Sequence, residues 1–346
     1  PAQTAPTCTL TTLTTADGSY TVNPTTGTVT FDPNPTFVGT VTVPVDYQVS
    51  DNGSTVQTVT ATITPTVIDK PTVRPDTTSA GWDVTQSINV VTDVAGSGTT
   101  NDAVASSDSV DPLISFEANS ITIDCALAAN CTETVVNGVV TEVIMAGQGT
   151  YTVDRATNVI TFNPVDTFTG TARPVTYTIS DALNQTASTT YTPTVIPAPV
   201  AINDTSTNGQ DKNQLIDVLN NDTVPTNPAG DPLNPASVKL CGTNPAQISP
   251  NCTLTTLTTA DGTYTVNPTT GVVTFDPIPS FTGTVATPVR YQVSDSGATP
   301  QVTSALITPT VIPGPTAQND TSSGPMNTAQ TETLVTNDSA ATGATL

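Results

Sequence analysis

Apolar and polar residues alternate in short runs along the whole chain, a period-two pattern that predicts β-strands. In a run over residues 43–51, Tyr47 and Val49 fall on one face and polar residues fall on the other. Two further runs, 19–22 and 28–31, flank a turn and predict a β-hairpin. Thirty prolines and 21 glycines interrupt the chain too often for long helices. The pattern therefore predicts an all-β fold.

The same pattern recurs three times along the chain. Residues 8–51 and 252–295 are nearly identical, and residues 149–181 form a looser copy. Equivalent tyrosines of the three copies are separated by 131 and then by 113 residues: Tyr20, Tyr151 and Tyr264. This spacing predicts one β-sandwich domain per repeat. The longer of these two separations predicts an insertion in the middle copy, within 93–111 and 133–147.

Each copy closes with the sequence Thr-Pro-Thr-Val-Ile, which predicts a final strand that runs into a linker. These closing strands divide the chain into four expected parts: the C-terminal part of a repeat module (1–68), a complete module with an insertion (69–197), a complete module (198–314) and the N-terminal part of a further module (315–346). The Asn-Asp pairs at 203–204 and 221–222 both recur 116 residues later, which identifies 315–346 as the opening of a module.

The charge of the chain excludes several functions. Only 7 basic residues stand against 29 acidic ones, and the net charge is −22. A nucleic-acid partner is excluded, because that binding depends on Lys and Arg that neutralise phosphates. No apolar run reaches 18 residues, so we expect no insertion into a membrane. Histidine is absent, as are a GxSxG motif and a phosphate-binding loop, so the chain is not expected to be an enzyme.

The five cysteines favour an oxidising, extracellular location. Cys241 and Cys252 flank a short loop, and Cys125 and Cys131 flank a shorter one at the equivalent place. Local pairing of each couple predicts two disulfides; the alternative is two pairs of buried free thiols. Cys8 is equivalent to Cys252, so its partner is expected outside the chain.

Two family resemblances follow from the recurring positions. The pattern GxYTV…GxVTFxPxxxFxGTxxPVxYxVxD…TPTV resembles the CshA-type fibril repeat of bacterial surface adhesins. The opening pattern AxNDxx…IDVLxND…DPL resembles bacterial cadherin-like and immunoglobulin-like tandem repeats, from which the middle copy departs at Pro75-Asp76-Thr77. The resemblance implies a tandem array of Ig-like or cadherin-like β-sandwich domains. It also implies a secreted fibril on the bacterial cell surface, whose repeats act as a stalk for a separate adhesive tip, and no enzymatic role.

Calcium is the one cofactor for which the sequence offers ligands. Oxygen-bearing side chains of the kind that bind Ca²⁺ cluster in the opening of the third module: Asp204, Asn221, Asp222 and Asp231. Cadherin-like adhesins place such ions near domain junctions, so the resemblance supports this set. The alternative is that Asn-Asp pairs form turns by bonding their own backbone. The same Asx-turn role is expected of Asp51, Asp181 and Asp295, which close the central strand of each copy.

Three functions remain open from the sequence. The first is a stalk that spaces an adhesive tip from the cell, with bending limited by proline-containing linkers at 196–199 and 312–315. The second is a filament subunit, in which the half-module at 316–346 completes the half-module at 1–68 of a neighbouring copy; a window cut from a longer array explains the same two halves. The third is a ligand-binding adhesin module, which the near-identity of the copies disfavours. The expected partners are neighbouring repeats of the same chain or identical chains, and the sequence identifies no host or surface ligand.

Overall fold

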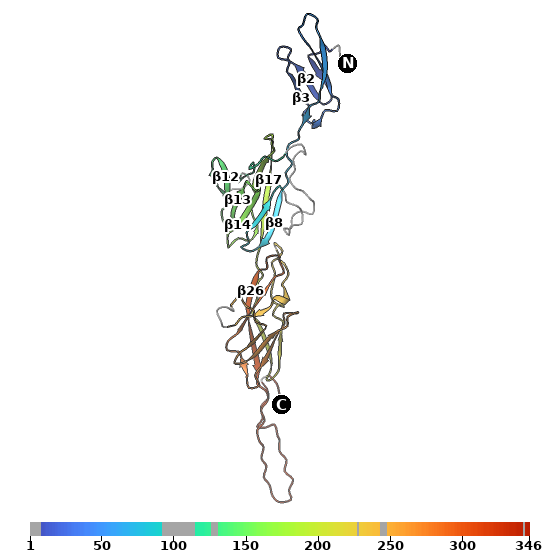
Figure 1. Cartoon of the computed structure of the whole chain (residues 1–346). Coiled ribbons are helices and arrows are strands. Elements are labelled where there is room, and N and C mark those ends of the chain that lie inside the picture. Colours follow the sequence, from blue (N-terminus) through green and yellow to red (C-terminus); the bar gives the residue numbers. More distant parts are fainter. Residues whose placement is uncertain (1–7, 92–114, 126–130, 227, 243–247, 342) are drawn as a thin grey trace.

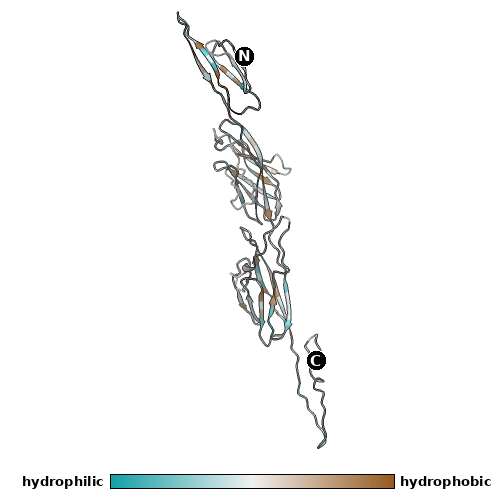
Figure 2. Cartoon of the chain, turned by 90° about the vertical axis from the view of Figure 1, so that its right-hand side faces the viewer, coloured by the Kyte–Doolittle hydropathy of each residue, from teal (hydrophilic) through white to brown (hydrophobic). Residues whose placement is uncertain are grey.

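The computed structural model of the chain describes all residues except 1–7, 92–114, 126–130, 227, 243–247 and 342. Figure 1 shows three β-sheet units arranged one after another, followed by an extended loop at the C-terminal end. Figure 2 shows the same row turned by 90°. We call these parts the first unit (residues 8–67), the second unit (72–196), the third unit (200–312) and the tail segment (316–339).

The third unit consists of two facing sheets. One sheet has the order β18-β26-β25-β20, with β24 added to β26, and the other has the order β19-β23-β22-β21. The strands are β18 (Asp204–Gly209), β19 (Gln214–Ile216), β20 (Lys239–Leu240), β21 (Thr256–Thr258), β22 (Gly262–Val266), β23 (Val273–Pro277), β24 (Gly283–Thr284), β25 (Val289–Ser294) and β26 (Val302–Ile312), with a 3-10 turn, η1 (Pro235–Ser237), between β19 and β20. We call β18–β20 the first half of the unit and β21–β26 its second half.

The second unit repeats this plan. Its sheets have the orders β10-β16-β17-β15, with β8 on β17, and β11-β12-β13-β14-β9. The strands are β8 (Asp76–Gly81), β9 (Gln86–Asn89), β10 (Thr122–Asp124), β11 (Cys131–Val136), β12 (Val139–Met145), β13 (Gly149–Asp154), β14 (Val159–Pro164), β15 (Gly170–Thr171), β16 (Val175–Ser180) and β17 (Thr186–Ile196). The expected insertion at 133–147 forms most of the β11–β12 hairpin, whereas the one at 93–111 lies outside the described residues.

In both of these units the first and last strands run side by side in the same direction. β18 pairs in parallel with β26 from Asp204 opposite Ile307 to Gly209 opposite Ile312. β8 pairs in parallel with β17 in the same way. The chain therefore enters each unit at one end and leaves it at the other, which accounts for the row seen in Figure 1.

The first unit contains only the second-half strands among the described residues. These are β1 (Thr12–Thr14), β2 (Gly18–Val22), β3 (Val29–Pro33), β4 (Gly39–Thr40), β5 (Val45–Ser50), β6 (Thr58–Ile63) and β7 (Thr66–Val67). They form a β1-β2-β3 sheet and two pairs, β4-β7 and β5-β6.

Alternation of apolar residues places a separate hydrophobic core between the sheets of the second and third units. An aromatic pair recurs in all three units with nearly the same ring separation: 4.7 Å for Tyr20–Phe31, 4.7 Å for Tyr151–Phe162 and 4.6 Å for Tyr264–Phe275. The hairpin turn requires a left-handed residue in each copy, as predicted: Gly27, Asn158 and Gly271 have φ of 73°, 57° and 75°. The all-β prediction is confirmed.

Candidate functional site: the junction between the two halves of a unit

A tyrosine on the central strand ties the two halves of the third unit together. Tyr291 on β25 is fully buried. Its hydroxyl lies 3.0 Å from both carboxylate oxygens of Asp222 and 2.9 Å from the Val218 carbonyl. Asp222 also accepts a hydrogen bond of 2.8 Å from the Ile202 N–H. A second-half side chain is thus held by two segments of the first half.

The second unit has a related contact, in which the tyrosine hydroxyl reaches a single segment of the chain. Tyr177 on β16 is also fully buried. Its hydroxyl donates to Asp76 Oδ2 at 2.7 Å and lies 3.1 Å from the Arg74 carbonyl. Asp76 opens β8, as Asp204 opens β18. In both units the buried tyrosine of the central strand thus contacts an aspartate from the opening part of the unit, although at different positions: Asp76 in the second unit and Asp222 in the third.

Two carboxyl groups at this junction, those of Asp204 and Asp222, have raised pKa values. Burial, together with the neighbouring Asp222 carboxylate, raises the pKa of Asp204 to about 7. Burial also raises the pKa of Asp222. Asp204 Oδ2 and Asn221 Oδ1 are buried and, among the described residues, have no hydrogen-bond partner. Asp204 Oδ2 can carry the proton that the raised pKa keeps on this carboxyl group, and both oxygens are of the kind that bind a cation such as Ca²⁺.

The structure separates the four residues predicted to bind calcium. Asp204, Asn221 and Asp222 come together around Tyr291. Asp231 lies instead beside Gly297, where a Cβ atom would fall 2.5 Å from Asp231 Oδ2. Within the described residues, no group of three or more His, Cys, Asp or Glu side chains is placed to hold a metal ion. The remaining three residues offer suitable oxygens, and calcium binding by them stays a prediction.

Two disulfides are present in the structure, one in each of the second and third units. Cys241 and Cys252 are bonded across a sequence separation of 11, with their Cα atoms 4.6 Å apart. Cys125 and Cys131 are bonded across a separation of 6. Cys8 is a free cysteine among the described residues, and a partner outside the chain stays a prediction. Its N–H donates to Gln48 as the Cys252 N–H donates to Gln292, each at 3.0 Å.

The Asx-turn role expected at the end of the central strand is confirmed in all three units. One carboxylate oxygen of Asp51, Asp181 and Asp295 accepts a backbone N–H from two residues further along the chain. Asp181 is fully buried and also receives the Gln185 N–H at 2.9 Å. These aspartates therefore shape a turn of the scaffold.

A glutamine at the same position of the second and third units faces the junction with the preceding unit. Gln185 Nε2 in the second unit lies 3.4 Å from the Ile68 carbonyl and 3.3 Å from the Asp69 carbonyl of the preceding linker. Gln301 in the third unit approaches Gly81 at the end of β8 so closely that a Cβ atom there would fall 2.4 Å from Gln301 Nε2. The junctions are therefore packed by side chains as well as spanned by short linkers.

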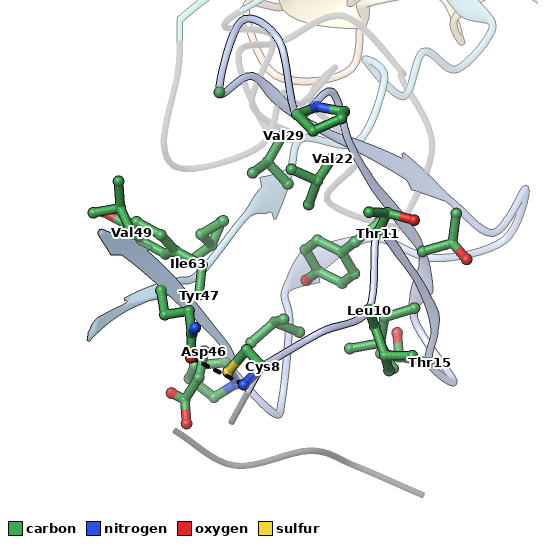
Figure 3. A pocket seen from close by; sticks show the side chains of 18 of the residues that line it. Cys8, Leu10, Thr11, Thr15, Val22, Val29, Asp46, Tyr47, Val49 and Ile63 are labelled. Carbon is green, nitrogen blue, oxygen red and sulfur yellow. Dashed lines mark hydrogen bonds between the residues drawn. The ribbon is translucent and has the colours of Figure 1, made fainter. Parts of the chain in front are cut away.

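The first unit has an open cleft where the other two have a closed core. The cleft has a volume of about 880 Å³. Figure 3 shows Tyr47 and Ile63 on one side of it and Val22 and Val29 on the other. Tyr47 is 39 % exposed, whereas its counterparts Tyr177 and Tyr291 are fully buried. The strand pattern predicts the apolar face correctly but does not reveal that the face is open among the described residues.

Comparison with known proteins gives one family match. The family model of the repetitive domain of the surface adhesin CshA matches residues 3–67, 85–195 and 197–311. The comparison with curated proteins gives no match. In the described part of the chain, no helix is both long and apolar enough to cross a membrane.

Similar solved structures include fragments of cadherin-23, titin and N-cadherin. Mouse cadherin-23 EC22-24 is 13 % identical, with 85 % of this chain and 82 % of that chain covered and a TM-score of 0.27. The I-band fragment I67-I69 of titin is 12 % identical, with coverage of 78 % and 74 % and a TM-score of 0.23. Drosophila N-cadherin EC1-3 is 13 % identical, with coverage of 85 % of each chain and a TM-score of 0.23.

Proposed function

The chain belongs to the family of the repetitive domain of the surface adhesin CshA, and from this premise we propose that it is the load-bearing stalk of a bacterial surface fibril. A surface adhesin acts outside the cell, at its surface. The proposed work of this chain is mechanical: it sets the distance between the cell and an adhesive tip and transmits tension between them. It has no catalytic step.

The observation that carries this proposal is the parallel pairing of the first and last strands within a unit. When a unit is pulled from its two ends, β18 and β26 are drawn in opposite directions along their length. Their ladder, from Asp204–Ile307 to Gly209–Ile312, is then loaded in shear, so that its hydrogen bonds must break together. The β8–β17 pair is loaded in the same way.

The cross-links between halves support the same role. The Tyr291 hydroxyl bridges β25 to the Asp222 turn, and the Cys241–Cys252 disulfide closes the loop that precedes β21. Both lie inside the unit and resist separation of its halves under tension. The proline-containing linkers and the glutamines at the junctions favour a limited bend between successive units.

The surface composition also suits a spacer. The net charge of −22 with only 7 basic residues disfavours association with the anionic surfaces of other cells and with like chains. Few lysines and arginines also leave few sites for trypsin-like proteases. The stalk is therefore expected to remain extended and separate.

Small-angle X-ray scattering of a lengthened chain tests the proposal. β26 has 11 residues, and at about 3.3 Å per residue it spans about 36 Å, which sets the length of one unit. Insertion of a second copy of residues 198–314 after residue 314 is expected to increase the maximum dimension by about 40 Å. An increase of less than half this value would show that the units fold back on each other, and a rigid spacer would then be ruled out.

A further inference from the structure

A buried glutamine joins the two sheets of the third unit at the parallel pair of strands. Gln214 lies on β19, in the sheet that faces the sheet of β18 and β26, and it is only 3 % exposed. The Ser206 hydroxyl on β18 donates to Gln214 Oε1 at 2.5 Å. Gln214 Nε2 donates to the Thr310 carbonyl on β26 at 3.0 Å. One side chain of the opposite sheet is therefore bonded to both strands of the parallel pair.

The second unit has the same group of three residues. The Thr78 hydroxyl on β8 donates to Gln86 Oε1 at 2.6 Å, and Gln86 Nε2 donates to the Thr194 carbonyl on β17 at 3.0 Å. The hydroxyl and the glutamine are eight residues apart in the sequence of both units. We call each group the clamp: Thr78, Gln86 and Thr194 in the second unit, and Ser206, Gln214 and Thr310 in the third.

The glutamine of the clamp has one orientation and lies away from water. A backbone carbonyl can only accept a hydrogen bond, so the amide nitrogen faces the last strand and the amide oxygen accepts from the hydroxyl. Gln86 lies opposite the buried Phe162. Gln214 lies opposite the buried Phe275 in the same way. Removal of one clamp group therefore leaves a buried polar partner unpaired, which is costly.

The clamp lies in the middle of the parallel ladder. Ser206 is the third of the six β18 residues that pair with β26. Thr78 holds the same place in the ladder of β8 with β17. A slip of one residue moves a strand by about 3.3 Å, which is too far for a hydrogen bond to survive. β18 therefore cannot slip by one residue along β26 unless Gln214 releases Ser206 or Thr310.

We propose that Gln86 and Gln214 are mechanical clamps, which tie the first and last strands of a unit to the opposite sheet and keep them from slipping under tension. In the described part of the third unit, β18 pairs only with β26, so no second strand of its own sheet holds it. The clamp supplies this second attachment. The inference rests on the proposed stalk function, because it concerns the same parallel ladder under load.

The second unit has a stronger form of the clamp. The Tyr191 hydroxyl on β17 lies 2.7 Å from Thr78 Oγ1. The single hydroxyl hydrogen of Thr78 goes to Gln86, so the Tyr191 hydroxyl donates to Thr78. Ile307 stands at the place of Tyr191 in the third unit and has no such group. The second unit is therefore expected to outlast the third under the same force.

Force-clamp measurements on the full chain test the clamp. Ser206→Ala is expected to shorten the lifetime of the third unit at a fixed force about tenfold, and Gln214→Met at least as much. Ser206→Thr restores the hydroxyl that the second unit uses and is expected to keep the lifetime within about threefold of the unmodified chain. The second unit of the same molecule is the internal reference. Its unfolding is recognised by the greater length of chain that it releases.

A matched control separates the clamp from a general loss of stability. Asp295→Ala removes a buried acceptor of two backbone N–H groups in the same unit, outside the β18–β26 ladder. Hydrogen–deuterium exchange measures the equilibrium stability of the third unit in each variant. Asp295→Ala is expected to lower this stability as Ser206→Ala does, but to change the lifetime under force less than about threefold.

Three results would overturn the clamp. The first is an unchanged lifetime of the third unit in both Ser206→Ala and Gln214→Met. The second is equal shortening by Ser206→Ala and Asp295→Ala at equal loss of equilibrium stability, which would show that the hydroxyl acts only through stability. The third is an unmodified chain with no force-resistant unit, which would overturn the stalk function and the clamp with it. Only the third concerns the stalk function, so the two failures are distinguishable.

Discussion

The Tyr291 hydroxyl provides the most direct test of the bond between the two halves of a unit. Tyr291→Phe removes this hydroxyl and leaves the ring in the core. The hydroxyl lies 3.0 Å from both Asp222 oxygens, and Asp222 is partly buried next to Asp204. Hydrogen bonds to charged groups contribute roughly 1.5–3 kcal/mol, so the loss is expected to be about 2 kcal/mol.

Hydrogen–deuterium exchange with mass spectrometry is a suitable assay, because it reports each unit separately. A loss of about 2 kcal/mol is expected to speed exchange of the slowest β25 amides about 30-fold. Peptides of the second unit are the internal reference and are expected to be unchanged. Tyr47→Phe is the matched control, because Tyr47 occupies the same position in the first unit but lies in the open cleft. Exchange of β25 that stays within threefold of the unmodified chain would refute the bond between halves.

Three further predictions concern the stability of the second and third units. The raised pKa of Asp204 means that the folded unit holds its proton more tightly than the unfolded chain. The contribution of protonated Asp204 to the free energy of unfolding is therefore complete below about pH 4 and is lost as the pH rises through about 7. This loss is expected to be about 2 kcal/mol after allowance for solvent screening. Thermal melts from pH 4 to 8 measure this loss, Asp204→Asn is expected to abolish it, and a calcium titration at pH 8 tests whether a cation replaces the proton. Cys241→Ser is expected to lower the free energy of unfolding in denaturant by roughly 3 kcal/mol, because the disulfide no longer constrains the loop. An equal loss from Cys8→Ser would contradict the disulfide as the cause. Asp181→Ala, which removes a buried acceptor of two backbone N–H groups, is expected to cost about 1–3 kcal/mol; the same turn at Asp51 is exposed, so a larger loss from Asp51→Ala in the same melts would argue against burial as the cause.

The sequence predicts local structure well because local structure depends on neighbouring residues. Alternation identifies the strands of each second half, and Gly27 and its counterparts mark the turn that needs positive φ. The Asx turn after the central strand also follows from a short motif. Each of these features forms within a few residues of the chain.

Contacts between distant segments are not predicted, because they depend on which strands meet. Tyr291 and Asp222 are 69 residues apart in sequence, and no local pattern brings them together. Residues 8–51 and 252–295 are nearly identical, yet Tyr47 is exposed and Tyr291 is buried. Their burial is set by first-half strands elsewhere in the fold. For the same reason Asp231, which has the right chemistry for a cation site, lies beside Gly297 and away from Tyr291.

Single-molecule pulling on the two ends of the chain tests the central claim most directly. The parallel β8–β17 and β18–β26 pairs predict two cooperative unfolding events at high force, one for each of the second and third units. The first unit and the tail segment, which have no such ladder in the described residues, are expected to extend at lower force. Gradual extension of the whole chain at one low force, without two distinct events, would contradict a load-bearing stalk.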